Sequence, residues 1–282
     1  MLAEIQVRRG VDATAMLCIA ITVVFWASSF AAIRACLGAL SPVELAAGRY
    51  VSAAVVAGLY LFAVRRPIPA WRDLGRLTFI GVIFIAAYST LLNTGELTVA
   101  AGPASFIINT MPVMVALIAM VTLGERLGHW GWIGTAVSFA GVGVIAASGP
   151  EGLHVGSGAV LILGAALCSA VASVLQKPLF KRYSALDVTA WVLLLGAVPL
   201  LAVLPSTVTA VVAAPAAVQT SVLYLAIFPT VIGYVTWSIA LSRMPAGRAA
   251  NFLYCVPPTA TLIGFLWLGE VPAFLGMVGG TQ

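Results

Sequence analysis

The sequence predicts an all-α membrane protein of ten transmembrane helices, arranged as two five-helix repeats of opposite topology. Three observations predict it: the composition, a succession of apolar runs, and an internal repeat. Of the 282 residues, 62% are hydrophobic and 8% are charged, whereas globular domains have about 45–50% apolar and about 25% charged residues. So few charges cannot cover a soluble protein of this length. A nucleic-acid partner is also excluded, because the net charge of +5 is spread over membrane-flanking segments.

Apolar runs long enough to cross a bilayer follow one another along nearly the whole chain. A span needs about 20 apolar residues, and each run stops at a short segment with glycine, proline or charge, such as 38–42, 65–73 or 124–128. The runs lie at 13–34, 42–63, 75–94, 102–123, 130–148, 157–177, 187–204, 219–241 and 248–268, and a tenth begins near 272. The first is interpreted as a retained signal-anchor, because nine more follow it.

The basic residues predict the orientation. With the N-terminus inside, Arg34 is the only basic residue of the outer segments, and Arg49 lies within the second span. The inner segments contain Arg8, Arg9, Arg65, Arg66, Arg72, Arg76, Arg126, Lys177, Lys181, Arg182, Arg243 and Arg248. The excess of positive charge predicts a cytoplasmic N-terminus, and ten spans return the C-terminus to the same side.

Residues 101–125 and 246–270 resemble each other at a constant offset of 145. Pro112 corresponds to Pro257, and Gly124-Glu125 corresponds to Gly269-Glu270. An odd number of spans per repeat inverts the second repeat, as in many secondary transporters. We therefore divide the chain into repeats at 1–148 and 149–282. The same offset would extend the tenth span to about residue 293, so we expect the last helix to be truncated in this chain.

The 5+5 layout, the AG-x-A…P…GE block of the fourth and ninth spans and the length resemble the drug/metabolite transporter superfamily, more narrowly its EamA-type ten-helix exporters. Among these, the chain looks most like the bacterial exporters of aromatic amino acids. The resemblance covers nearly the whole chain. It implies a multi-pass protein of the bacterial cytoplasmic (inner) membrane, with lipid and a small-molecule substrate as partners. It also implies a central cavity, lined by spans one to four and six to nine, that opens alternately to each side.

Aromatic and polar side chains recur within these spans. Polar groups in a membrane are costly and face a cavity or another helix, and aromatic faces with a few amides suit an amphipathic organic solute. The candidate substrate-binding residues are Trp26, Ser29, Arg49, Tyr88, Asn93, Asn109, Tyr234, Trp237, Ser238, Asn251 and Tyr254. For each of them, helix–helix packing or hydrogen bonding is the alternative, and Arg49 has the further alternative of reaching the interface with its long side chain.

Three prolines are candidate hinges, because proline removes a backbone hydrogen bond and kinks a helix. Pro112, Pro257 and Pro258 lie at related positions of the two repeats, and static curvature is the alternative. Lys177 and Arg248 are interpreted as orientation signals, or else as part of an inner vestibule.

The carboxylates are predicted at span ends, where they cannot serve as a buried proton carrier. The carboxylates at these ends are Glu44, Glu96, Glu125, Asp187 and Glu270, five of the nine Asp and Glu residues in the chain. We therefore expect transport that is uncoupled or only weakly coupled to protons.

No enzyme, cofactor or metal site is indicated. The four cysteines (Cys18, Cys36, Cys168 and Cys255) lie in or beside apolar runs without a CxxC pair, and His129 and His154 are predicted on opposite sides of the membrane. The leading hypothesis is a secondary transporter that exports amino acids, with aromatic or hydrophobic ones favoured. The alternatives are an exporter of drugs or other amphipathic metabolites, and a sugar-phosphate or nucleotide-sugar exchanger. We expect a monomer; a small-residue seam in the fifth span makes a dimer the alternative.

Overall fold

The computed structural model describes residues 12–125, 128–129, 132–137, 140 and 156–268. This part of the chain is helical and contains no β-strand. Eight of its helical segments are long and apolar enough to cross a membrane. They are Ala13–Cys36, Pro42–Ala63, Trp71–Gly95, Pro103–Leu123, Ser157–Lys181, Ala185–Ala213, Ala216–Arg243 and Ala246–Trp267. They correspond to the predicted spans one to four and six to nine.

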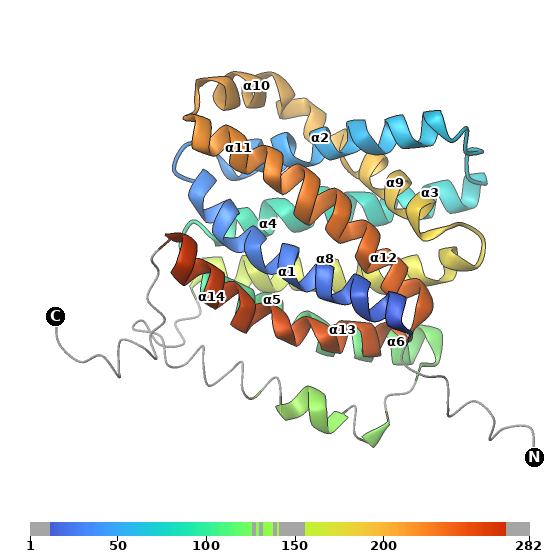
Figure 1. The fold of residues 1–282 in the computed structure, drawn as a ribbon. Coiled ribbons are helices and arrows are strands. Elements are labelled where there is room, and N and C mark those ends of the chain that lie inside the picture. The colour runs from blue at the N-terminus through green and yellow to red at the C-terminus, as the bar shows by residue number, and fades with distance from the viewer. Residues whose placement is uncertain (1–11, 126–127, 130–131, 138–139, 141–155, 269–282) are drawn as a thin grey trace, which may run out of the picture.

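The segments are built from α-helices joined, in several spans, by short 3₁₀ or π turns (Figure 1). In order they are α1 (Ala13–Cys36), α2 (Pro42–Ala63), α3 (Trp71–Gly81), η1 (Val82–Ala87), α4 (Tyr88–Gly95), α5 (Ala101–Ile108), α6 (Met111–Leu123), α8 (Ser157–Gln176), η2 (Lys177–Lys181), α9 (Ala185–Gly196), η3 (Val198–Val203), α10 (Leu204–Ala213), α11 (Ala216–Leu225), η4 (Ala226–Ile232), α12 (Gly233–Arg243), α13 (Ala246–Asn251), η5 (Phe252–Cys255) and α14 (Val256–Leu268).

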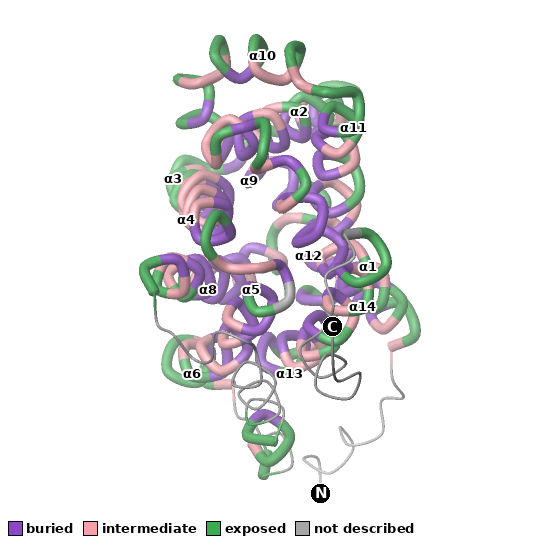
Figure 2. The backbone as a smooth tube through the Cα atoms, turned by 90° about the vertical axis from the view of Figure 1, so that its left-hand side faces the viewer, coloured by how far each residue is buried: buried purple, intermediate pink, exposed green. Residues whose placement is uncertain are grey.

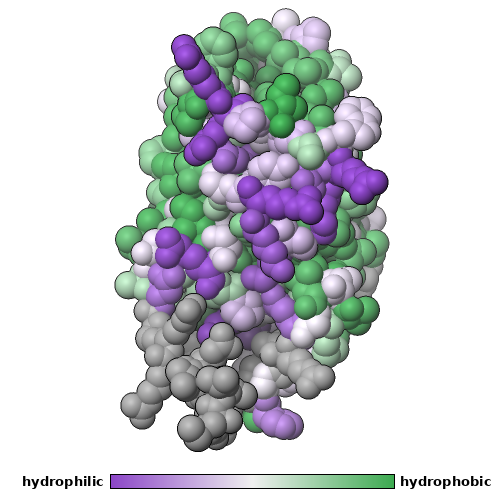
Figure 3. All heavy atoms as spheres, turned by 90° about the vertical axis from the view of Figure 1, so that its right-hand side faces the viewer, coloured by the Kyte–Doolittle hydropathy of each residue, from purple (hydrophilic) through white to green (hydrophobic). Residues whose placement is uncertain are grey.

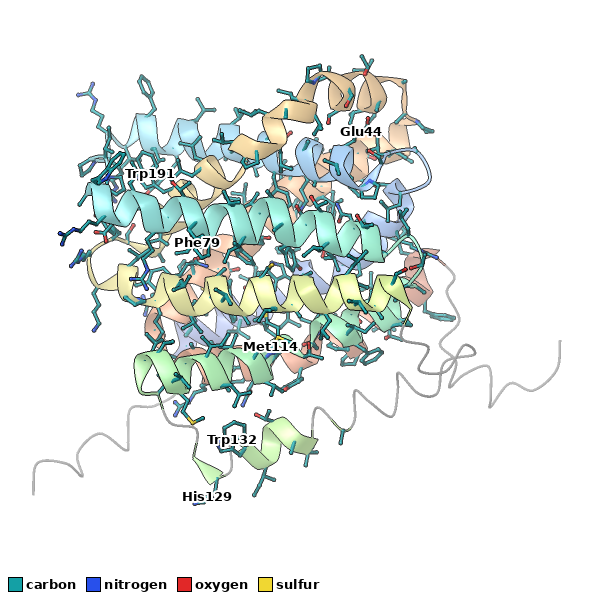
Figure 4. The ribbon with its side chains drawn as sticks, turned by 180° about the vertical axis from the view of Figure 1, so that it is seen from behind. Glu44, Phe79, Met114, His129, Trp132 and Trp191 are labelled. Atoms are coloured by element: carbon teal, nitrogen blue, oxygen red, sulfur yellow. The ribbon has the colours of Figure 1, made fainter. Side chains whose placement is uncertain are left out.

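Several predicted features lie outside the described residues. These include the tenth span with Glu270, the boundary between the repeats at 148/149, and His154. Of the fifth span, residues 132–137 are helical, and His129 and Trp132 lie beside the main bundle (Figure 4).

Local signals in the sequence account for where the helices begin and end. Ser41 and Glu44 form a capping box at the start of α2, with Pro42 in the first turn, where a missing N–H costs nothing. Asp12 accepts from the Ala15 amide at the start of α1. At the end of α6, Gly124 has a φ of 66°, a left-handed conformation that glycine adopts without steric cost.

The seventh span is longer than predicted. The sequence places its end near 204, but the helix continues through η3 into α10 and ends at Ala213. Pro205 suggests the end of a helix when only the sequence is considered. It lies instead in the first turn of α10, a position that proline favours.

The helices turn their buried sides toward a shared interior (Figure 2). α1 packs against α12 and α14, while α8 packs against α4 and α6, and α2 packs against α9. Glycines let two of the helix pairs approach closely. A Cβ on Gly81 would lie 2.7 Å from Gly196 N, and one on Gly158 would lie 2.9 Å from the Gly95 carbonyl oxygen.

The irregular turns lie at related positions of the two predicted repeats. The π turn η1 of the third span covers Val82–Ala87, and the π turn η4 of the eighth covers Ala226–Ile232, which the offset of 145 brings into register within one residue. The fourth span is interrupted at residues 109–110, just before Pro112, and the ninth by η5, just before Pro257. Because proline cannot donate a backbone hydrogen bond, both spans lose their α-helical ladder at this point.

The end of the bundle where α1 begins presents many hydrophilic residues (Figure 3), and the described ion pairs below lie at this end. They join Asp12 to Arg243, Arg66 to Asp187, Asp73 to Arg182, and Glu125 to Lys177. The hydrogen bond from Arg243 lowers the pKa of the Asp12 carboxyl. The hydrogen bond with Tyr60 raises the pKa of Arg66.

Candidate functional site

A cavity of about 40 Å³, measured as the space open to the centre of a water-sized sphere, lies inside the bundle. Its walls come from helices of the first to fourth, sixth, eighth and ninth spans. The lining residues are Trp26, Ser29, Phe30, Arg49, Phe84, Tyr88, Ile108, Asn109, Met111, Pro112, Ser169, Tyr234, Leu253 and Val256. A single water needs about 10–15 Å³ on this measure. The cavity as it stands therefore has room for a few waters, and a larger molecule would fit only if the cavity widened.

An aromatic cluster forms one wall of this cavity, with Tyr234 at its centre. The Tyr234 ring stacks on Phe84, with centroids 4.8 Å apart and planes 13° apart. Trp26 meets the same ring edge-on at 5.8 Å, and the Tyr234 hydroxyl lies 2.8 Å from that of Tyr50. Such contacts fix flat faces against which an aromatic or aliphatic group can pack.

The π turn η4 supplies polar groups beside this cluster. The Trp26 indole nitrogen donates to the Pro229 carbonyl oxygen at 3.1 Å. The Thr230 hydroxyl donates to Leu225 O at 2.8 Å and accepts from Arg49 Nε at 2.6 Å. π turns expose backbone groups to other partners and occur often at functional sites. The unwound stretch thus orients both Trp26 and Arg49.

Arg49 is the one charged residue in the lining. Its side chain is buried, with 4% of the residue exposed, and its guanidinium carbon lies 4.8 Å from the Tyr50 ring centroid. Within the described part of the chain, its only hydrogen bond is through Nε, and no carboxylate forms an ion pair with it. A buried cation is costly unless it is paired. An anionic group in the cavity would complete its coordination.

Asn109 presents an acceptor on the cavity wall. Its amide nitrogen donates to the Ser105 carbonyl oxygen at 2.8 Å. That carbonyl can only accept, so it determines which end of the Asn109 amide is nitrogen. The other end, Oδ1, is buried and has no partner within the described residues. The lining residues therefore include an unpaired hydrogen-bond acceptor, Asn109 Oδ1, and a cation without an ion-pair partner in the described chain, Arg49.

The structure places the predicted binding residues in two groups. Those that line the cavity are Trp26, Ser29, Arg49, Tyr88, Asn109 and Tyr234, together with the predicted hinge Pro112. The others lie outside its lining. Trp237 packs against Trp26 at 5.5 Å, and Ser238 accepts from Thr189 Oγ1 at 2.7 Å.

The remaining predicted residues also lie away from the lining. Asn93 donates to the Pro42 carbonyl oxygen at 2.9 Å, and Asn251 accepts from Thr135 at 3.3 Å. Tyr254 is half-buried on η5. Of the other two predicted hinges, Pro257 is buried and Pro258 is exposed.

Sequence reasoning missed half of the cavity lining. The missed residues are Phe30, Phe84, Ile108, Met111, Ser169, Leu253 and Val256. Apolar residues of a membrane helix look alike whether they face lipid or a cavity, so composition carries no signal for most of them. Phe30 is the exception, because it shares a helix face with Trp26. Ser169 donates to Met111 Sδ at 3.1 Å.

A multi-pass helical bundle with a binding cavity between its helices is an architecture that membrane transporters use. The profile of the EamA-like transporter family matches residues 13–147 and again 156–281. The chain therefore belongs to this family of transporters and is not an enzyme, which confirms the resemblance to the EamA-type transporters.

Two curated relatives and one solved structure illustrate the similarity. The chain is 40% identical over 263 residues to a "Probable terminal-alkyne amino-acid exporter" of Streptantibioticus cattleyicolor, covering 92% of this chain and 87% of the relative. It is 32% identical to the uncharacterized transporter YdfC of Bacillus subtilis, over 90% of this chain and 83% of that one. A crystal structure matches with a TM-score of 0.70 and 20% identity, covering 95% and 94% of the two chains. At that identity it supports the fold alone.

Proposed function

We propose that the chain exports amino acids, with aromatic or other hydrophobic side chains favoured, across the bacterial cytoplasmic membrane by alternating access. The observation that carries this proposal is Arg49, a buried cation without an ion-pair partner in the described residues, on the wall of a cavity whose other lining residues are uncharged and largely apolar or aromatic. An amino acid matches that wall. Its carboxylate suits Arg49, its ammonium group suits Asn109 Oδ1, and its side chain suits the rings around Tyr234.

A relative supports the substrate class. The 40% identical protein of S. cattleyicolor is named as a probable exporter of a terminal-alkyne amino acid, and an alkyne group is an apolar hydrocarbon. The cavity residues Phe30, Ile108, Leu253 and Val256 offer an apolar surface of the same kind. A linear aliphatic side chain and an aromatic ring are both compatible with it.

For the architecture, we propose ten spans in two inverted five-helix repeats, with both termini cytoplasmic. The matched π turns η1 and η4 support the repeat. So does the packing, because α1 contacts spans eight and nine while α8, in the sixth span, contacts spans three and four. Pro112 and Pro257 interrupt related helices and serve in this proposal, with Pro258, as hinges between the two access states.

For the energetics, we propose facilitated export that is uncoupled or weakly coupled to protons. The described carboxylates Asp12, Glu44, Asp73, Glu96, Glu125 and Asp187 all lie at or beyond span ends. No acid of the described chain lines the cavity. A monomer is sufficient for this mechanism, because one chain supplies the whole lining.

A second candidate is the export of drugs or other amphipathic metabolites, which the aromatic wall also favours. A sugar-phosphate or nucleotide-sugar exchanger is less well supported. Such substrates have two or more negative charges and would call for several buried basic residues, whereas Arg49 is the one charge in the lining.

Counterflow in proteoliposomes tests the proposal. Vesicles loaded with unlabelled phenylalanine should accumulate labelled phenylalanine, and tryptophan and propargylglycine (a terminal-alkyne amino acid) should compete. UDP-glucose should not compete. If folded protein gives no phenylalanine or propargylglycine counterflow, the substrate class is wrong, and a panel of drugs and metabolites becomes the next test.

A further inference from the structure

A cluster of side-chain and backbone groups joins four spans at the bundle end where α1 begins. Lys177 Nζ donates to the carbonyl oxygens of Leu241 at 3.0 Å and Met244 at 2.5 Å. It also lies 3.6 Å from Glu125 Oε1. Glu125 Oε2 accepts from the Ala246 amide at 2.8 Å. We call these five residues the latch. They connect the ends of the fourth, sixth, eighth and ninth spans.

The latch uses groups that helices leave without partners. The last carbonyls of α12 and the first amide of α13 have no partner inside their own helices. A cation suits the former and a carboxylate suits the latter. The side chains of Lys177 and Glu125 are 21% and 19% exposed, so water reaches the cluster. Water can also pair with backbone groups at helix ends, so these groups can remain satisfied if the latch contacts break.

A row of residues on one face of α8 and η2 leads from the cavity to the latch. Ser169, Ser173 and Lys177 follow one another at intervals of four, which places them one above the other on a helix. Ser169 lines the cavity and Lys177 belongs to the latch. Between them, Ser173 is fully buried, and its hydroxyl has no hydrogen-bond partner in the described chain.

A second row on α12 has the same organisation. Tyr234 lines the cavity, and the Leu241 carbonyl accepts from the latch lysine. Between them lies Trp237, which is 1% exposed and whose indole nitrogen has no partner among the described residues. Buried polar groups without partners are rare and costly. Two of them occur here, each between the cavity and the latch, on the two spans that Lys177 connects.

We propose that Ser173 and Trp237 line the route between the cavity and this end of the bundle, and that the latch closes that route. This inference rests on the proposed function, since it assumes an alternating-access transporter. The structure shows the latch formed, and in this proposal the route is then closed. When Lys177 leaves the end of α12, the route opens, and water or the substrate's polar groups reach Ser173 and Trp237. Lys177 acts here as a gating residue.

Thiol accessibility tests this proposal. Ser173→Cys is made in a chain whose four cysteines are replaced, and it is reacted in vesicles with a charged, membrane-impermeant methanethiosulfonate from each side. With the latch intact, we expect slow modification. Lys177→Met should accelerate modification from the side where α1 begins by at least about tenfold, the effect of losing one charge-assisted hydrogen bond. Modification from the opposite side should not accelerate.

The matched control is Lys181→Met, the same substitution one turn further along. Lys181 is exposed, and the described structure gives it no hydrogen bond or ion pair. Glu125→Gln is a second test should Lys177→Met fold poorly, and we expect a smaller acceleration because the glutamine oxygen can still accept from Ala246. Equal rates in the parent, both latch variants and the control would overturn the proposal. The assay needs no substrate, so a latch response without phenylalanine counterflow would refute the substrate class alone.

Discussion

Replacement of Arg49 is the most direct perturbation of the candidate site. Arg49→Met removes the one charge of the cavity lining and keeps a long apolar side chain of similar reach. In the folded protein, the loss is small. The 2.6 Å bond to Thr230 and the contact of the guanidinium with the Tyr50 ring disappear, and Thr230 retains its own bond to Leu225. Because an unpaired buried cation destabilises a fold, we expect unchanged or slightly higher thermal stability.

The effect on transport should be much larger. If the guanidinium holds the substrate carboxylate, the variant loses at least one charge-assisted hydrogen bond, which contributes about 1.5–3 kcal/mol. At about 1.4 kcal/mol per factor of ten, the KM for phenylalanine should rise about 10- to 150-fold. Arg49→Lys should raise the KM by a smaller factor, because lysine keeps the positive charge although it lacks the planar donor groups of the guanidinium.

The assay is phenylalanine counterflow with phenethylamine, which lacks the carboxylate, as a competitor. Arg49→Met should weaken phenylalanine binding, seen as a higher KM, and should leave inhibition by phenethylamine nearly unchanged. Arg72→Met, at an exposed basic residue near the start of the third span, serves as the control. An unchanged phenylalanine KM, or an equal loss for both compounds in folded protein, would refute the assignment of Arg49 to the carboxylate.

Three further predictions address the cavity, the coupling and the packing. Trp237→Ala should reduce phenylalanine transport more than Trp191→Ala. The reason is that Trp237 packs against Trp26 at the cavity, whereas Trp191 lies toward one end of the bundle (Figure 4). An equal loss of transport in two folded variants would count against the cavity assignment. Transport rates should barely change when a pH gradient is imposed across the vesicle, and a strong, reversible acceleration would establish proton coupling. Gly81→Val should lower stability in a melting assay by about 1–3 kcal/mol through overpacking, since a Cβ there meets the α9 backbone at 2.7 Å. Gly75→Val, with nothing within 4 Å of its Cβ, should be tolerated, and similar melting temperatures for the two would contradict this reading of the contact.

Much of the fold could be predicted because residues close to each span boundary determine where the helix begins or ends. The second span is predicted at 42–63 and observed at Pro42–Ala63, since Ser41, Pro42 and Glu44 form a recognisable helix start. The seventh span was predicted too short, because Pro205 has the same identity whether it ends one helix or begins another. The π turns were not predicted, since nothing in the local sequence distinguishes η1 from regular helix.

The sequence by itself determined the membrane class, the family, the order of the spans and a set of polar candidates that includes Arg49 and Asn109. Only the tertiary structure decided which of those candidates share a cavity and that Phe84, Leu253 and Val256 complete its wall. The physical reason is the solvent. In water, a helix shows its buried side by an apolar stripe. In lipid, both the outer surface and the core are apolar, so the side that faces the cavity is set by packing against other helices.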